Sequence, residues 1–115
     1  MITIKGVDPG MIANNITPFE PIHPGELLKD ELRERGISQK HFAELIGVPY
    51  TALNETLNCK RPMSVDFSLL VEAALGIDAN LFINMQTRYN TLTARENKTL
   101  AKRLEAIRGL CASFL

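Results

Sequence analysis

The chain has 115 residues, and its 13 basic and 13 acidic side chains give a net charge of zero at pH 7. This length allows one domain with a substantial core, and no apolar run approaches the ~20 residues that a membrane-spanning helix needs. A balanced charge argues against a protein that binds through a strongly basic surface. The first residues also lack the basic and apolar regions of a signal peptide, so we expect a cytoplasmic location.

The chain carries no pattern typical of catalysis or metal binding. Cys59 and Cys111 are far apart and fit no CxxC spacing, and such thiols stay reduced in the cytosol. His23 and His41 form no ligand pattern with them, and we expect His23 to cap a helix and His41 to lie on the surface. We therefore predict no cofactor, no metal and no enzymatic activity.

The N-terminal part of the chain differs from the residues after it. Residues 1–21 show no sustained periodicity and contain Pro18 and Pro21, which predicts an extended N-terminal arm. Pro24 suits the first position of a helix. We expect that helix to run to Arg35, where Gly36 ends it.

The stretch from Ser38 to Leu57 is typical of a helix-turn-helix. Ser38 can cap a first helix over about 39–46, and Gly47 can supply the left-handed turn after it. Pro49 can open a second helix, expected over about 49–57. In DNA-binding versions of this motif the second helix enters the major groove. The predicted shared core comprises Phe42, Ile46, Val48 and Leu53, and Ala43 is expected where the two helices approach most closely.

Three further helices complete the prediction. Ser64 can cap a fourth helix over about 65–75, ended by Gly76, and Asp78 can cap a fifth. From about Thr93 an apolar stripe predicts an amphipathic C-terminal helix that packs on the domain or pairs with a second chain. We therefore divide the chain into an arm (1–21), a helix-turn-helix domain (22–91) and a C-terminal element (92–115). The apolar positions are Phe67, Leu70, Val71, Ala74 and Leu75 in the fourth helix, Leu81, Phe82 and Met85 in the fifth, and Leu100, Leu104, Ile107, Cys111 and Phe114 in the last.

Three segments together resemble one family. The sequences IHPGELL at 22–28, NCKR at 58–61 and LFINMQTRY at 81–89, with the helix-turn-helix between them, are similar to those of HigA-type antitoxins. These belong to the lambda-repressor-like (XRE) superfamily, and the resemblance covers about residues 22–90. It implies an all-α, five-helix fold, a homodimer and repression from a palindromic operator in double-stranded DNA. It also implies a partner, a HigB-type toxin with a RelE-like ribonuclease fold that cuts messenger RNA on ribosomes.

Two positions depart from that family's pattern. Cys59 stands where the family usually has glycine, and a positive φ there would strain a cysteine by about 1 kcal/mol or somewhat more. Alternatively, the loop has another shape, which would misplace Lys60 and Arg61. Thr56 replaces a buried aliphatic residue, and its hydroxyl can bond the helix carbonyl four residues earlier.

The candidate DNA-binding residues divide by role. By resemblance Gln39 would hold a backbone phosphate at a helix N-terminus, while Tyr50 and Thr51 face base edges. Asn and Glu one turn later could contact adenine and cytosine, and the loop beyond would clamp the sugar-phosphate strand. The full set is Gln39, Lys40, Tyr50, Thr51, Asn54, Glu55, Asn58, Lys60 and Arg61.

The sequence leaves several alternatives open. Tyr50 could be an aromatic side chain covering the core, Asn54 could point sideways, and Glu55 could pair with Lys60. The loop with Lys60 and Arg61, called the basic loop below, could simply be solvated. At the level of function, the chain could be a stand-alone repressor-like regulator without a toxin, or a protein-interaction module that has lost DNA binding, as its neutral charge would allow.

Overall fold

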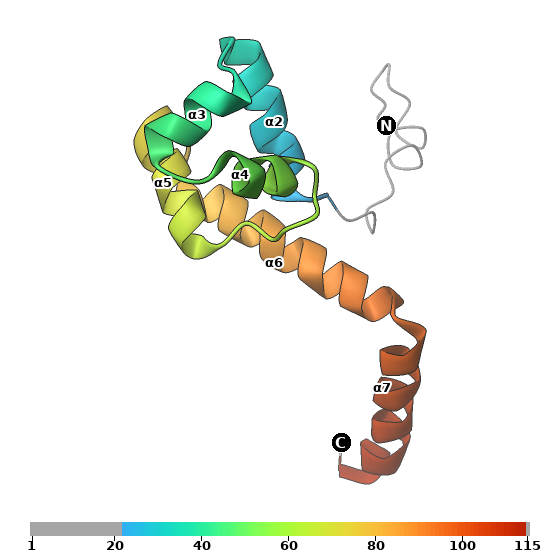
Figure 1. The fold of residues 1–115 in the computed structure, drawn as a ribbon. Helices are drawn as coiled ribbons and strands as arrows, with labels where there is room; N and C mark the ends of the chain where they lie inside the picture. The colour runs from blue at the N-terminus through green and yellow to red at the C-terminus, as the bar shows by residue number, and fades with distance from the viewer. Residues whose placement is uncertain (1–21, 115) are drawn as a thin grey trace, which may run out of the picture. The chain divides into compact units, whose positions relative to one another are not determined.

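In the computed structural model, residues 22–114 are described and every regular element among them is helical, which confirms the all-α prediction. Residues 22–91 form one compact unit and residues 92–114 belong to another, so each is described by itself. The predicted arm over 1–21 lies outside the described residues. The helices are α2 (Pro24–Arg35), α3 (Gln39–Ile46), α4 (Tyr50–Leu57), α5 (Val65–Leu75), α6 (Ala79–Glu96) and α7 (Lys98–Cys111), and the 3-10 turn η1 (Ala112–Phe114) comes last (Figure 1).

The core of residues 22–91 lies where the apolar faces of short helices meet. α4 packs against both α2 and α3, and α3 also packs against α5 (Figure 1). Each helix has only part of its surface apolar, so the helices are stable only when these parts bury one another. The buried core comprises Leu28, Leu32, Phe42, Ala43, Ile46, Leu53, Leu57, Met63, Val71 and Phe82.

Local capping fixes where these helices begin and end. Nδ1 of His23 accepts a hydrogen bond from the Gly25 amide at 2.9 Å, and the hydroxyls of Ser38 and Ser64 accept from amides three residues on, both at 3.1 Å. These bonds satisfy amides that otherwise lack helical partners. Glycines with positive φ end α2, α3 and α5: Gly36, Gly47 and Gly76.

Two predicted helix boundaries are wrong. Pro49 is not the first residue of α4 but its N-cap, without a side-chain cap bond. The C-terminal helix does not begin near Thr93, because α6 continues to Glu96. Asn97 then caps α7, since its Oδ1 accepts from the Leu100 amide at 2.9 Å.

Some predicted core positions are exposed instead. Leu70 and Leu81 are 39% and 45% exposed, and Val65 and Leu69 of α5 are also exposed. The reason is that α5 is apolar around most of its circumference, while a helix at the edge of a small domain buries only one face. An apolar surface on α5 therefore remains open in the single chain.

α7 carries its apolar residues on the surface. None of its residues is buried, Leu100 and Leu104 are half-buried, and Ile107 and Leu110 are 50% and 79% exposed. A helix with such a stripe gains stability only when the stripe meets another apolar surface.

Candidate nucleic-acid interface

The turn between α3 and α4 has the geometry that the motif requires. Gly47 has φ +74°, and the amides of Gly47 and Val48 both donate to the carbonyl of Ala43, at 2.9 and 3.1 Å. These bonds close the end of α3 in the manner of a left-handed cap. α4 (Figure 1) then buries Leu53, Thr56 and Leu57 against the core.

The first turn of α4 presents two exposed side chains. Tyr50 is 50% exposed, and Thr51 is exposed as well. Among the described residues, neither side chain makes a hydrogen bond to the protein. Both are therefore able to reach a ligand on this face without first breaking a contact.

The second turn of α4 is held by a chain of side-chain hydrogen bonds. Nδ2 of Asn54 donates to Oε1 of Gln39 at 3.0 Å. Nδ2 of Asn58 donates to Oδ1 of Asn54 at 3.2 Å and to its main-chain carbonyl at 2.9 Å. Nζ of Lys29 completes the chain by donating to Oδ1 of Asn58 at 3.2 Å. The alternative in which Asn54 points sideways thus describes its position in this structure.

These bonds bring together three predicted site residues and one that sequence reasoning missed. Gln39, Asn54 and Asn58 come from α3, α4 and the residue after α4, and Lys29 comes from α2. Lys29 lies among several charged residues of α2, so no local pattern distinguished it. Only the packing of α2 against α4 brings it to Asn58.

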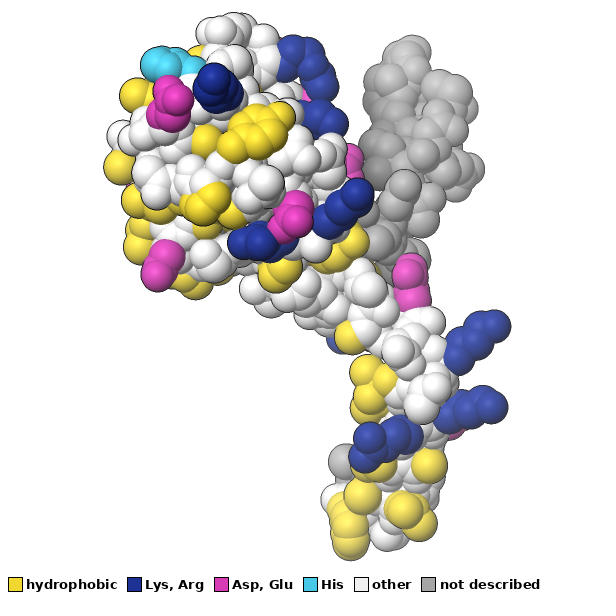
Figure 2. Space-filling model, in the orientation of Figure 1, with side chains coloured by type: hydrophobic (Ala, Val, Ile, Leu, Met, Phe, Trp, Pro, Cys, Tyr) yellow, Lys and Arg dark blue, Asp and Glu magenta, His cyan; other side chains and the backbone are white. Residues whose placement is uncertain are grey.

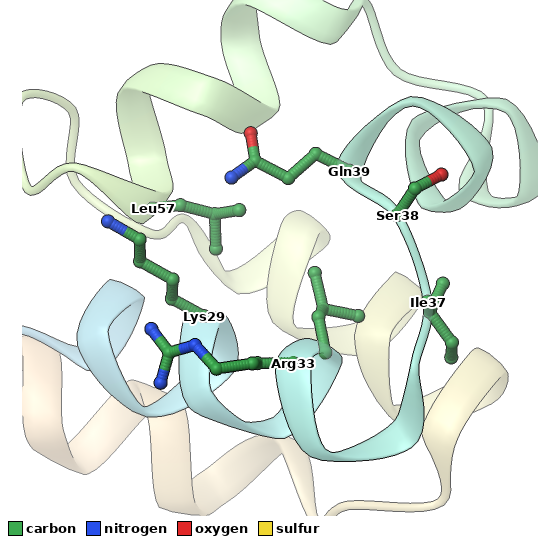
Figure 3. A pocket seen from close by; sticks show the side chains of 7 residues that line it. Lys29, Arg33, Ile37, Ser38, Gln39 and Leu57 are labelled. Atoms are coloured by element: carbon green, nitrogen blue, oxygen red, sulfur yellow. The ribbon is translucent and has the colours of Figure 1, made fainter.

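A hollow of about 240 Å³ lies beside Gln39, between α2 and the start of α3. Figure 3 shows Lys29 and Arg33 extending along one side of it and Gln39 entering from the other, with the amide nitrogen turned toward Lys29 and the oxygen toward α4. Its lining is Lys29, Leu32, Arg33, Ile37, Ser38, Gln39 and Leu57.

Glu55 pairs with the basic loop, but not with the predicted partner. Its Oε1 accepts from Nε and a terminal nitrogen of Arg61 at 3.1 and 2.8 Å. The alternative that pairs Glu55 with Lys60 is therefore wrong. Figure 2 shows an acidic side chain flanked by basic ones on this face. Both partners are about half exposed, and such pairs contribute little net stability, so a phosphate could displace the carboxylate from Arg61.

The loop after α4 places Cys59 in the left-handed conformation that glycine favours. Cys59 has φ +65°, and the Lys60 amide donates to the carbonyl of Glu55 at 2.8 Å. Lys60 and Arg61 are exposed in this loop, and the positive φ strains Cys59. Burial and the Glu26 carboxylate raise the pKa of the Cys59 thiol, whose Sγ lies 3.8 Å from Oε2 of Glu26.

Residues of the segments 22–28 and 81–89, which resemble the HigA-type pattern, support this loop. Oε1 of Gln86 accepts from the Met63 amide at 2.8 Å. The His23 ring lies in the same hollow as Arg61 and meets Tyr89 edge to face, with ring centroids 5.0 Å apart. Burial lowers the pKa of His23, against the opposing effects of the Arg61 backbone and the Glu26 charge. These two segments thus act together to support the basic loop.

Gly25 allows α2 to approach α4 closely. A Cβ at this position would collide with the main-chain carbonyl of Thr56. Thr56 is buried, and its hydroxyl donates to the Ala52 carbonyl at 2.9 Å, as predicted. The remaining candidate, Lys40, is exposed on α3, as is the neighbouring His41.

Within residues 22–114, no three His, Cys, Asp or Glu side chains lie where they could hold a metal ion. In the same range, no helix combines the length and the apolar character needed to cross a membrane.

The fold and this surface define a helix-turn-helix protein, and comparison with known proteins identifies its family. No family model matches the chain. Virulence-associated protein I of Dichelobacter nodosus is 35% identical over 78 residues, which cover 67% of this chain and 72% of that protein. The Pseudomonas aeruginosa antitoxin HigA, solved with the higBA promoter, is 31% identical with a TM-score of 0.68, covering 76% of this chain and 94% of that one.

A third relative has the same coverage. An addiction module antidote protein of the HigA family from Coxiella burnetii is 28% identical with a TM-score of 0.66, again over 76% of this chain and 94% of that one. The chain belongs to the HigA-type family of helix-turn-helix antitoxins. The two solved relatives are by name an antitoxin and an antidote protein.

Proposed function

We propose that this protein is a DNA-binding antitoxin that represses its own operon and neutralises a HigB-type ribonuclease toxin. The main support is that α4 exposes Tyr50 and Thr51 in its first turn, bonds Gln39 through Asn54 and leads into the loop with Lys60 and Arg61. The fold that carries this surface is similar to that of a HigA antitoxin solved with the higBA promoter. An exposed second helix is the element that enters the major groove in this class of motif.

The contacts divide between bases and backbone. Thr51 offers a hydroxyl and a methyl group to base edges, and Tyr50 offers its ring to a thymine methyl or its hydroxyl to a phosphate. Gln39, Lys60 and Arg61 hold the two flanking phosphate strands. The amide of Asn58 already donates twice to Asn54, so Asn58 joins them only by exchanging one of these bonds. Asn54 and Glu55 are already bonded within the protein, so a base contact by either requires exchange of its present partner.

The DNA half of the proposal is tested by fluorescence anisotropy with two duplexes, one of random sequence and one from upstream of the protein's own gene. We expect affinity for both to fall steeply with salt because counterions are released, with tighter binding to the upstream duplex. Arg61→Ala should weaken binding to both duplexes alike and reduce the salt slope by about 1. No binding to either duplex at low salt would favour a protein-interaction module instead.

The proposed neutralisation of a toxin is tested with the product of the neighbouring gene. We expect its product to arrest growth when expressed alone, and co-expression of this chain to restore growth through a complex that survives purification. A neighbouring gene whose product neither arrests growth nor binds this chain would leave a stand-alone regulator.

A dimer is proposed because one copy occupies only half of a palindrome, and two copies about 34 Å apart occupy both halves. The exposed stripe of α7 is the proposed interface. Ile107→Glu should then give a monomer in sedimentation velocity, whereas Arg103→Glu, at another position of α7, should leave the dimer intact. If Ile107→Glu also stays dimeric, the exposed Leu69 on α5 is the next position to test.

A further inference from the structure

The hydrogen bonds from Lys29 to Gln39 have a direction that Lys29 favours. A primary amide has an oxygen that accepts and a nitrogen that donates, so a row of amides can be ordered in either of two ways. An ammonium group can only donate. Lys29 therefore favours the order in which Asn58 turns its oxygen toward α2 and its nitrogen toward Asn54.

The orientation of Asn58 determines the rest of the order. Because Oδ1 of Asn54 accepts from Asn58, its nitrogen is left to donate to Oε1 of Gln39. The main-chain carbonyl of Asn54 can only accept, and it favours the same orientation of Asn58 as Lys29 does. The last group in the row is Nε2 of Gln39, which Figure 3 shows turned to the side of the hollow where Lys29 lies.

We propose that Lys29 is a positioning residue that orders the side-chain amides of Asn58, Asn54 and Gln39, so that Gln39 presents its nitrogen and not its oxygen to a DNA phosphate. The inference rests on the proposed DNA binding. In the opposite order the Gln39 oxygen would face the phosphate oxygens and repel them, although the same residues would be in the same places.

The alternative is that Lys29 acts only through its positive charge. A substitution of Arg33 is the control that distinguishes this effect from the ordering of the amides. Arg33 lies one turn further along α2 and lines the same hollow, but it pairs with Asp30 at 2.8 Å and has no bond to the amide row. Lys29→Met and Arg33→Met each remove one positive charge beside Gln39 while keeping an unbranched helix-forming side chain. Only the first removes the donor from the row.

The experiment compares these variants in two measurements. In the DNA-free protein, Lys29→Met should shift the side-chain amide resonances of Asn58, Asn54 and Gln39 together, whereas Arg33→Met should leave those of Asn58 and Asn54 in place. Lys29→Arg, which restores a donor, should return the resonances toward their original positions. Thermal unfolding of each variant verifies that the fold is unchanged.

In DNA binding, Lys29→Met should weaken affinity about fivefold more than Arg33→Met, the size of one typical hydrogen bond. In a Gln39→Ala background, Lys29→Met should cost no more than Arg33→Met. Equal effects of the two variants on resonances and affinity, or an undiminished Lys29→Met effect without Gln39, would overturn the inference. A wild-type protein that binds no DNA would count against the proposed function, while the resonances would still decide the order of the amides.

Discussion

The two turns of α4 differ in how their side chains are held. Tyr50 and Thr51 in the first turn make no side-chain hydrogen bonds within the described part of the chain, whereas Asn54 in the second turn is bonded to both Gln39 and Asn58. The loop after the second turn is supported by His23 and Gln86. One end of the helix is thus open and the other is preassembled.

This difference matches the two kinds of contact that DNA recognition needs. Phosphates recur along every duplex, so groups that hold them gain from being fixed in advance. Base edges vary, and the side chains that meet them must be exposed at the groove. Substitutions in the first turn of α4, in its second turn and in the residues that support the second turn should therefore have effects of different kinds and sizes.

The support of the second turn depends on the close approach of Gly25 to Thr56. Gly25→Ala should lower the free energy of unfolding by about 3 kcal/mol, because the new Cβ forces α2 away from α4. Urea denaturation measures the loss. Gly109→Ala, whose Cβ would meet nothing within 4 Å, is the matched control and should not destabilise α7. An unchanged stability in Gly25→Ala would show that the helices can separate without cost.

The first turn of α4 should confer sequence preference, and the second turn with the Asn58 that caps it should not. Thr51→Ala should cost roughly 1–3 kcal/mol at one base position, while Asn58→Ala should weaken binding to all sequences alike. Competition with single-base operator variants measures both effects. Thr51→Ser keeps the hydroxyl and shows whether the methyl group contributes. The division is wrong if Asn58→Ala changes preference and Thr51→Ala does not.

The basic loop should be stabilised by removing the strain at Cys59. Because φ is +65° there, Cys59→Gly should raise the free energy of unfolding by about 1 kcal/mol. Cys59→Ala keeps a Cβ in the same conformation and should give no such gain. Equal unfolding midpoints for the two variants would mean that the strain is relieved elsewhere.

The smallest effect concerns pH. Since burial lowers the pKa of His23 in the folded state, the unfolded chain binds more protons below about pH 6.5. The contribution of His23 to stability should therefore be complete above pH 6.5 and decline as pH falls toward the lowered folded pKa. Urea midpoints at pH 7.5 and 5.5 measure the decline. His23→Asn can still cap α2 but does not titrate, so an identical decline in this variant would exclude His23 as its source.

The sequence alone was sufficient for features that depend on neighbouring residues. Ser38 and Ser64 predicted helix starts, and Gly47 predicted the turn, because caps and left-handed conformations are decided within four residues. The same local reasoning failed at Pro49, where the N-cap and the first helical position are adjacent, and at Asn97, whose capping ability the apolar periodicity did not reveal.

Which distant side chains meet depends on the packing of the helices. Asn54 is 15 residues from Gln39, Asn58 is 29 from Lys29, and the His23 ring reaches Tyr89. Glu55 pairs with Arg61 and not with Lys60, although Lys60 is nearer to it in the sequence. Composition and spacing name the groups that can bond, but the packing angles of the helices select the partner, and a hydrogen bond tolerates only a narrow range of distance and direction.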